Sequence, residues 1–391
     1  MNKIKKLYDK YVLGTYTRQD VCLVKGDGVW VEDSEGKKYL DFFPGWAVSG
    51  TGHRHPKVIK RVSEQLEKIL HVSNNYYNEL QGELAEKIIK YSFKGKVFFA
   101  NSGAEANEGA IKLARKYGSP DRYEIITMER SFHGRTLATL TATGQDKVKK
   151  GFAPLPEGFK HVPFNDIDAF ISAVTDKTVA VMLEIIQGEG GINVADAEYI
   201  KKLNRICKEK DILLIVDEVQ TCMGRTGKMF AFEYYDIEPD VMTLAKSLGG
   251  GMPIGALVVN EKHKDVLGPG THASTFGGSP IICAAALGVF EAIEEDDLLE
   301  NVNSMGEYLV LKIEELKKKY SMIGKVCGKG LMIGVKLDIE DASEIVAGCV
   351  KEGLLLNCTQ KNILRIMPPI TVSKENIDTA ISKLSTVLEK L

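Results

Sequence analysis

Two polar residues follow apolar runs of strand length, at positions where a buried sheet presents functional groups. Asp217 comes directly after the run 212–216, and Lys246 follows the run 240–245 with three glycines close behind it. Ligands of parallel sheets bind at the carboxyl ends of the strands. Most lysines are solvated surface residues, but a lysine kept partly dry has a lowered pKa and can form a Schiff base. We therefore interpret Lys246 as a candidate nucleophile and Asp217 as an acid suited to a pyridine nitrogen.

A third candidate is the turn at residues 101–107, Asn-Ser-Gly-Ala-Glu-Ala-Asn, between an expected strand and an expected helix. Free N–H groups and the dipole at a helix N-terminus favour an anion such as phosphate. Taken alone, the turn is better explained as an ordinary cap by Ser102, with Glu105 in the first helical turn. Together, an amine, an acid and an anion cradle are the three groups that pyridoxal phosphate requires.

The middle of the chain is expected to form the sheet that positions these groups. Near-continuous apolar strands that alternate with helices predict a parallel sheet covered on both faces. Strands are expected at 96–100, 123–128, 178–185, 212–216, 240–244 and 255–259, with helices at 104–117 and about 197–210.

Both ends of the chain lack this alternation. Near the N-terminus, the pattern predicts a hairpin at 29–33 and 38–42 and a helix at about 58–70. Near the C-terminus, it predicts long Lys/Glu-rich helices at 291–320 and 374–391, with strands between them at 331–337 and 363–367. We therefore expect a large α/β domain at 56–285, and a smaller α+β domain built from the arm at 1–55 and from 286–391.

Composition excludes several classes of protein. The chain has 391 residues, and 51 Lys and Arg against 53 Asp and Glu give a net charge of −2, which argues against a general nucleic-acid binder. No apolar run approaches the roughly 18 residues of a membrane span. The seven widely spaced cysteines include no Cys-x-x-Cys pair, which is typical of a reducing cytosol. We expect a cytoplasmic protein with no secretory signal and no nucleic-acid or membrane partner.

Nine short motifs occur in one order along the chain: Gly52–Pro56, His71–Asn74, the Ser102 turn, Phe132–Arg135, Gln187–Gly191, Asp217–Gln220, Lys246, Ser274–Gly278 and Leu364–Arg365. Over essentially its whole length the sequence resembles the class III pyridoxal-phosphate-dependent aminotransferases of fold type I, and within them the acetylornithine aminotransferase family. The segments 151–154 and 161–166 favour that branch. The resemblance implies a mainly parallel seven-stranded sheet and a homodimer with shared active sites.

The resemblance also implies how the cofactor is held. Lys246 would bind pyridoxal 5′-phosphate covalently and, once released, move the proton between the substrate carbon and the cofactor C4′. Asp217 would pair with the pyridinium nitrogen. The further cofactor contacts would come from Ser102, Gly103, Ala104, Phe132, Val219, Gln220 and the partner subunit's Thr275.

On the substrate side, the resemblance assigns one arginine to each carboxylate. Arg135 would hold the α-carboxylate of the amine donor, and Arg365 that of glutamate or 2-oxoglutarate, with Ser274 beside the substrate. An arginine offers each carboxylate a planar bidentate fork. Glu189 would pair with Arg365 while the ω-amine substrate is bound and swing aside for the dicarboxylate.

The implied activity transfers the δ-amino group of N²-acetyl-L-ornithine to 2-oxoglutarate in a ping-pong reaction, giving N-acetyl-L-glutamate 5-semialdehyde and L-glutamate in arginine biosynthesis. Succinylornithine, ornithine, 4-aminobutyrate and acyl-lysine-type aminotransferases remain alternatives. An aminomutase is a further alternative, against which Arg365 and Glu189 count. A catalytically dead homologue is disfavoured by Lys246, Asp217 and Arg135.

Other polar clusters have simpler explanations. His53 and His55 are a weak ligand set because no carboxylate or cysteine accompanies them, so we expect no metal. Cys222 is interpreted as a small packing residue. Ala104 replaces a threonine that is common in the family, and Ile185 replaces a common proline; neither change affects the expected chemistry.

Overall fold

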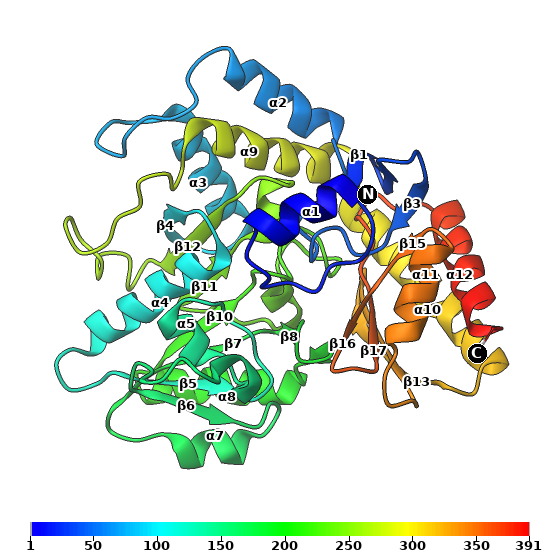
Figure 1. Ribbon diagram of the computed structural model, residues 1–391. Coiled ribbons are helices and arrows are strands. Elements are labelled where there is room, and N and C mark those ends of the chain that lie inside the picture. The colour runs from blue at the N-terminus through cyan, green and yellow to red at the C-terminus, as the bar shows by residue number, and fades with distance from the viewer. Residues whose placement is uncertain (1, 391) are drawn as a thin grey trace.

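The apolar runs in the middle of the chain form a seven-stranded sheet. The computed structural model describes residues 2–390 (Figure 1). In spatial order, the strands of this sheet are β4 (Gly95–Ala100), β12 (Gly255–Asn260), β11 (Val241–Leu244), β10 (Leu213–Asp217), β7 (Thr178–Leu183), β5 (Glu124–Met128) and β6 (Phe159–Val162). Strand β12 is antiparallel to both neighbours, and every other pair is parallel. The predicted mainly parallel α/β sheet is therefore confirmed.

Helices cover both faces of this sheet, which explains why its central strands are apolar throughout. Every residue of β7 and β10 is buried, and successive side chains of a strand point to opposite faces. Leu213 belongs to the hydrophobic cluster that contains Leu113 of the helix at 103–118, whereas Leu214 belongs to the cluster that contains Leu203 of the helix at 197–209. The helices and short elements of this part are α4 (Gly103–Gly118), α5 (Leu137–Ala142), α6 (Asp146–Lys149), α7 (Ile167–Ala173), β8 (Ile186–Gln187), β9 (Asn193–Val194), α8 (Ala197–Glu209), and the 3-10 helices η1 (Ala231–Tyr235) and η2 (Lys246–Gly249).

Three further helices, α2 (Pro56–Leu66), α3 (Glu79–Tyr91) and α9 (Pro280–Glu295), lie together along one side of the sheet (Figure 1). Helix α2 approaches α9 so closely at Gly288 that a Cβ there would lie 2.8 Å from the Cα of Val58. The glycine therefore permits this helix crossing.

The two ends of the chain share one sheet. Strand β15 (Leu354–Leu355) pairs in parallel with β3 (Lys38–Asp41), and β2 (Trp30–Asp33) and β1 (Leu23–Asp27) continue the sheet. Beside it lies a second sheet in the order β13 (Ile323–Lys329), β14 (Met332–Leu337), β17 (Ile363–Ile366) and β16 (Asn357–Thr359). The remaining helices are α10 (Leu298–Lys319), α11 (Ser343–Lys351) and α12 (Lys374–Leu388). The domain division at 1–55, 56–285 and 286–391 stays a prediction, and helix α9 runs through its second boundary.

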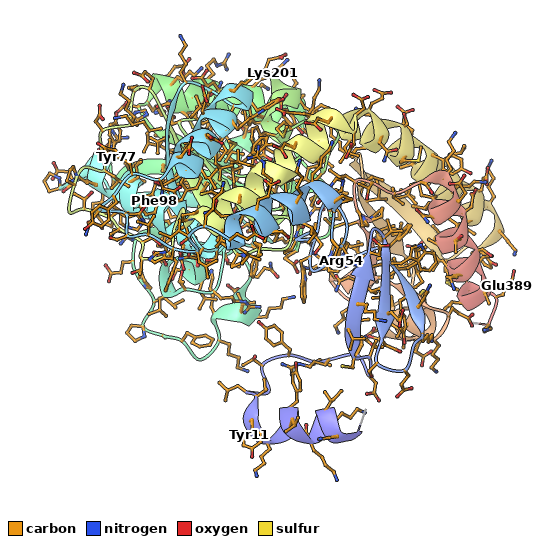
Figure 2. The ribbon with its side chains drawn as sticks, turned by 90° about the horizontal axis from the view of Figure 1, so that it is seen from above. Tyr11, Arg54, Tyr77, Phe98, Lys201 and Glu389 are labelled. Atoms are coloured by element: carbon orange, nitrogen blue, oxygen red, sulfur yellow. The ribbon has the colours of Figure 1, made fainter. Side chains whose placement is uncertain are left out.

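The first helix, α1 (Asn2–Tyr11), stands apart from the rest of the chain, as Figure 2 shows at Tyr11. The segment after it exposes large apolar side chains, and Leu13 is 82% exposed. Between residues 2 and 390, no helix combines the length and the apolar character needed to cross a membrane.

Three expectations about helices differ from the structure. The helix expected at about 58–70 is α2, which begins at Pro56 and ends at Leu66. The single helix expected at 291–320 is wrong: α9 ends at Glu295 and α10 begins at Leu298, because Asp297 adopts a left-handed conformation with φ of 50°. The last helix ends at Leu388, and residue 391 of the expected range lies outside the described residues. Several elements were not expected from the sequence, among them α3, α7, α11, β6 and β13.

Candidate active site

A cavity of about 350 Å³ lies beyond the carboxyl ends of β10 and β11, where the sequence placed the functional groups. The structure brings most of the predicted site residues to its wall. These residues are Ser102, Gly103, Ala104, Phe132, Arg135, Glu189, Asp217, Val219, Gln220 and Lys246. Arg365, Ser274 and Thr275 do not line this cavity, and their places are described below.

Lys246 follows β11 and begins η2 with φ of 46°, a left-handed conformation that is uncommon outside glycine. Such backbone strain persists where the surroundings hold a residue firmly, which is frequent at functional sites. Burial lowers the pKa of the Lys246 ammonium, although the nearby carboxylates of Glu189 and Asp217 act in the opposite direction. A lysine in this setting has a larger neutral, nucleophilic fraction than a surface lysine.

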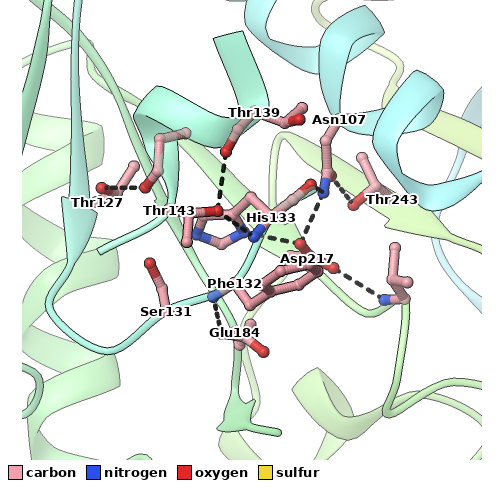
Figure 3. A network of polar contacts seen from close by, with 12 residues as sticks. Asn107, Thr127, Ser131, Phe132, His133, Thr139, Thr143, Glu184, Asp217 and Thr243 are labelled. Atoms are coloured by element: carbon pink, nitrogen blue, oxygen red, sulfur yellow. Dashed lines mark hydrogen bonds and ion pairs between the residues drawn. The ribbon is translucent and has the colours of Figure 1, made fainter. Parts of the chain in front are cut away.

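Asp217 is the last residue of β10 and is 3% exposed (Figure 3). Its Oδ2 accepts a hydrogen bond of 2.8 Å from the Asn107 side-chain amide and lies 2.8 Å from Nδ1 of His133, while its Oδ1 accepts from the Val219 N–H at 3.0 Å. Thr243 donates to the Asn107 oxygen at 2.6 Å and so orients that amide. The carboxylate therefore has a fixed orientation beside the cavity.

Asn107 and His133 were not predicted as site residues, although both lie inside quoted motifs. Asn107 is a polar residue that is 1% exposed in α4, and His133 is 2% exposed. The apolar spacing of this helix places Asn107 on its buried face. A buried amide requires a hydrogen-bond partner, so the sequence pattern could have marked Asn107 as a residue with a polar contact.

The turn before α4 serves as a helix cap, and it also faces the cavity. The Ser102 hydroxyl accepts a hydrogen bond of 3.2 Å from the Glu105 N–H. Helix α4 begins at Gly103, and the N–H groups of a first turn have no acceptor within their own helix. A Cβ at Gly103 would lie 2.7 Å from Val219, so only glycine lets the turn approach that side chain. This arrangement can hold an anion.

Gln220 gives a direct sign that this cavity receives a polar ligand. Its side chain is buried, and within residues 2–390 neither its amide nitrogen nor its amide oxygen has a hydrogen-bond partner. Buried polar groups are nearly always paired. The Gly188 backbone lies directly against Gln220, because a Cβ at position 188 would be 1.8 Å from its Oε1. The unpaired amide therefore fits a polar group of a bound cofactor.

Glu184 also lines the cavity, and sequence analysis missed it. It follows β7 and is 6% exposed, and it accepts hydrogen bonds from the backbone N–H groups of Phe132, at 3.0 Å, and Gly188, at 3.2 Å. Burial raises the pKa of this carboxyl to about 7. Glu184 lies inside the run 178–185 that was expected to form one strand, so its place just after β7 became visible only in the structure.

The two predicted substrate arginines differ in exposure. Arg365 is 1% exposed, and its Nη1 donates a hydrogen bond of 2.6 Å to Oε1 of Glu189. Arg135 is exposed at the cavity wall, with its guanidinium 5.4 Å from the centre of the Phe132 ring. The predicted Glu189–Arg365 pair is thus present, and Arg135 is open to a ligand.

Ser274 and Thr275 line a separate cavity of about 350 Å³ with Asn101, His272 and Phe276. Thr275 is exposed, and the Ser274 hydroxyl accepts a hydrogen bond of 3.0 Å from the Gly277 N–H. The structure does not bring these two residues to the main cavity of their own chain, so the expectation that they act in a partner subunit stays a prediction.

The polar residues given simpler explanations have local partners. His53 Nε2 lies 2.8 Å from Asp41 Oδ2, and His55 Nε2 lies 3.3 Å from Asp296. In the part of the chain from residue 2 to residue 390, no group of three or more metal-ligating side chains is arranged around a common point. Burial raises the pKa of the Cys222 thiol to about 12, which suits a packing residue.

Comparison with known proteins identifies the family. A family model described as Aminotransferase class-III matches residues 14–388. The acetylornithine aminotransferase of Caldanaerobacter subterraneus subsp. tengcongensis is 54% identical over 386 residues, covering 98% of each chain. That of Methanocaldococcus jannaschii is 51% identical over 389 residues, again 98% of each chain. Among solved structures, the ornithine aminotransferase of Toxoplasma gondii ME49 has a TM-score of 0.95 at 31% identity, covering 100% of this chain and 95% of that chain.

The chain belongs to the class-III aminotransferases. It is a pyridoxal-phosphate-dependent transaminase, as the motifs predicted. The unpaired Gln220 amide and the open first turn of α4 fit that cofactor.

Glu218, the neighbour of Asp217, gives a prediction about stability and pH. It is fully buried away from the cavity, accepts a hydrogen bond of 2.8 Å from the Phe232 N–H, and has a pKa raised by burial from 4.5 to about 7. The folded protein therefore holds this proton to higher pH than the unfolded chain does. By linkage, its contribution to stability declines as the pH rises from about 4.5 to about 7.

We expect Glu218→Gln to reduce this decline. Between about pH 5 and about pH 8, thermal unfolding should show a smaller fall in the melting temperature of Glu218→Gln than of the native protein. Glu307→Gln, at an exposed position of α10, should follow the native curve. Parallel curves for Glu218→Gln and the native protein would contradict the assignment of a raised pKa.

Proposed function

We propose that this transaminase transfers the δ-amino group of N²-acetyl-L-ornithine to 2-oxoglutarate, giving N-acetyl-L-glutamate 5-semialdehyde and L-glutamate, as a step of arginine biosynthesis. The observation that carries this proposal is the ion pair between Arg365 and Glu189, of which Glu189 lines the cavity, because such a pair suits one site that accepts two differently charged substrates. The relatives with 51–54% identity are acetylornithine aminotransferases, whereas the ornithine aminotransferase structure is 31% identical.

The protein side of the reaction follows from the cavity wall. Pyridoxal phosphate supplies an electron sink for breaking the C–H bond beside the amino group. Lys246 would hold the cofactor covalently and, once released, would move the proton at the substrate carbon. The Asp217 carboxylate, held by three donor groups, would keep a proton on the ring nitrogen.

The remaining cavity residues position the cofactor. Phe132 and Val219 would pack against the cofactor ring, and Gln220 would use its unpaired amide to hydrogen-bond the phenolic oxygen. The open first turn of α4, with Ser102, Gly103 and Ala104, would bind the phosphate.

The arginines bind the two substrates in turn. Arg135 is exposed at the cavity wall, where it holds the α-carboxylate of the amine donor and leaves the terminal amine near Lys246. Glu189 compensates the buried charge of Arg365 during that half-reaction. When the dicarboxylate enters, Glu189 moves away and Arg365 binds the α-carboxylate, since a buried arginine without a partner is costly.

We also propose that the enzyme acts as a cytoplasmic homodimer, with no nucleic-acid or membrane partner. Ser274 and Thr275 lie outside the cavity of their own chain, and Thr275 is exposed on its loop. In the dimer, Thr275 would contact the phosphate bound in the other chain, and Ser274 would lie beside the substrate there.

A substrate panel tests the substrate assignment. With 2-oxoglutarate as acceptor, kcat/KM should be highest for acetylornithine. It should fall by about tenfold or more for free ornithine, whose second ammonium lies close to Arg135, because like charges repel. Succinylornithine and 4-aminobutyrate complete the panel. A wide preference for free ornithine or 4-aminobutyrate would refute the assignment, and amine transfer without 2-oxoglutarate would indicate an aminomutase.

A further inference from the structure

The short edge strand β16 contacts Arg365, the cation of the Glu189–Arg365 pair. In the ladder between β16 and β17, Asn357 lies directly opposite Arg365. The Asn357 oxygen accepts two hydrogen bonds from the guanidinium, from Nε at 2.8 Å and from Nη2 at 2.5 Å. Nη1 donates to Glu189. The Asn357 oxygen and the Glu189 carboxylate therefore lie at different edges of the planar Arg365 guanidinium.

The end of β16 and the following residue hold the backbone of the acidic member. The Thr359 hydroxyl donates to the Glu189 carbonyl oxygen at 2.7 Å, and the Gln360 side-chain amide donates to the same oxygen at 2.9 Å. The Glu189 side chain is 26% exposed, and its only hydrogen-bond donor among residues 2–390 is Arg365. The backbone is therefore fixed, and the carboxylate is the part of Glu189 that can move.

Asn357 holds Arg365 without cancelling its charge. The guanidinium is almost fully buried and lies 4.7 Å from the centre of the Phe43 ring. When Glu189 moves away, Asn357 keeps Nε and one hydrogen of Nη2 paired, so Nη1 and the second Nη2 hydrogen are free to form the bidentate fork with an incoming carboxylate. A carboxylate at position 357 would instead form a permanent ion pair with the arginine, because one oxygen at this position already accepts from both Nε and Nη2.

We propose that Asn357 is a positioning residue that sets the affinity for the dicarboxylate substrate: its neutral oxygen holds the Arg365 fork in both half-reactions while leaving the full positive charge available. This inference rests on the proposed function, since it requires Arg365 to bind the α-carboxylate of glutamate or 2-oxoglutarate. Asn357 lies on the far side of Arg365 from Glu189, so it acts through the arginine.

The test compares Asn357→Asp, which has the same shape with an added charge, with Asn357→Ala, which removes the acceptor. Each half-reaction is followed separately in the holoenzyme by the change in cofactor absorbance. Asn357→Asp should raise the 2-oxoglutarate concentration needed for half-maximal rate by on the order of 10–100-fold, and Asn357→Ala should raise it less. The rate with acetylornithine should stay within about threefold for both variants.

Calorimetric titration of 2-oxoglutarate into the holoenzyme gives a second readout that needs no turnover, and should show the same loss of affinity. Cys358→Ser, at the neighbouring position of β16, is the matched control and should behave as the native enzyme. Equal losses in both half-reactions, or an Asn357→Asp affinity within about threefold of native, would overturn the proposal. Failure of acetylornithine as a donor would refute the proposed function instead. The 2-oxoglutarate measurement on the Asn357 variants would then be repeated with the amine donor that the substrate panel supports.

Discussion

Lys246→Ala should lose turnover by on the order of 10³-fold or more, because the substitution removes both the covalent attachment of the cofactor and the group that moves the proton. General acid–base catalysis alone contributes about 10²–10⁴-fold. The cavity should remain otherwise intact, since Lys246 makes no side-chain hydrogen bond with another residue between positions 2 and 390. Loss of activity should therefore accompany normal folding.

The measurement is steady-state turnover together with borohydride reduction and peptide mass spectrometry. The native enzyme should carry the reduced cofactor on the peptide that contains residue 246, and the variant should carry none there. Lys149→Ala is a demanding control, because burial also lowers the pKa of Lys149, yet this residue lies outside the cavity. Lys149→Ala should keep its activity, whereas near-native turnover in Lys246→Ala would show that the lysine assignment is wrong.

Asp217→Asn is expected to lower kcat by on the order of 10²–10³-fold, the cost of removing one preorganised electrostatic contact. The amide has almost the same shape, so the contacts with Asn107 and Val219 can largely persist. What is lost is the negative charge that keeps a proton on the cofactor ring nitrogen. The absorbance spectrum of the bound cofactor should therefore change together with the rate.

The neighbouring carboxylate provides the control for this prediction. Glu218 is equally buried but does not line the cavity, so Glu218→Gln should keep the native spectrum and rate. If Asp217→Asn retained native kcat and spectrum, the pairing of Asp217 with the ring nitrogen would be refuted. If both variants lost activity equally, the effect of Asp217 would be one of packing.

Sequence patterns predicted the large sheet well because its central strands are buried on both faces. The run at 213–217 is apolar until Asp217, so both the strand and its functional end are visible in the composition. The break between α9 and α10 carries no glycine or proline signal, because residues 294–297 are Glu-Glu-Asp-Asp and a single left-handed residue, Asp297, separates the two helices. Strand β6 was missed because three of its four residues are only partly buried and its pattern is weak.

The site was predictable where residues follow one another along the chain, and less so where distant segments meet. The position of Lys246 after an apolar strand run already marked it as a candidate, whereas the Glu189–Arg365 pair came only from the motif resemblance. Nothing in the order of residues indicates that Asn357 faces Arg365, since β16 has only three residues and its contact depends on strand register. Glu184 was missed because the apolar run expected as a strand, 178–185, continues past it, so the end of β7 at Leu183 was not visible in the composition.

The parallel pairing of β15 with β3 has a consequence for how the protein is made. Leu40 and Leu354 are neighbours in the sheet but are separated by more than 300 residues of chain. At about 5–20 residues per second, a ribosome needs roughly 15–60 s to synthesise the intervening segment. During that time the β1–β3 hairpins have an open edge, which is a template for wrong pairing. Completion of the smaller sheet is therefore a late, post-synthetic event, and chains that end before residue 354 should be the ones that chaperones and proteases bind.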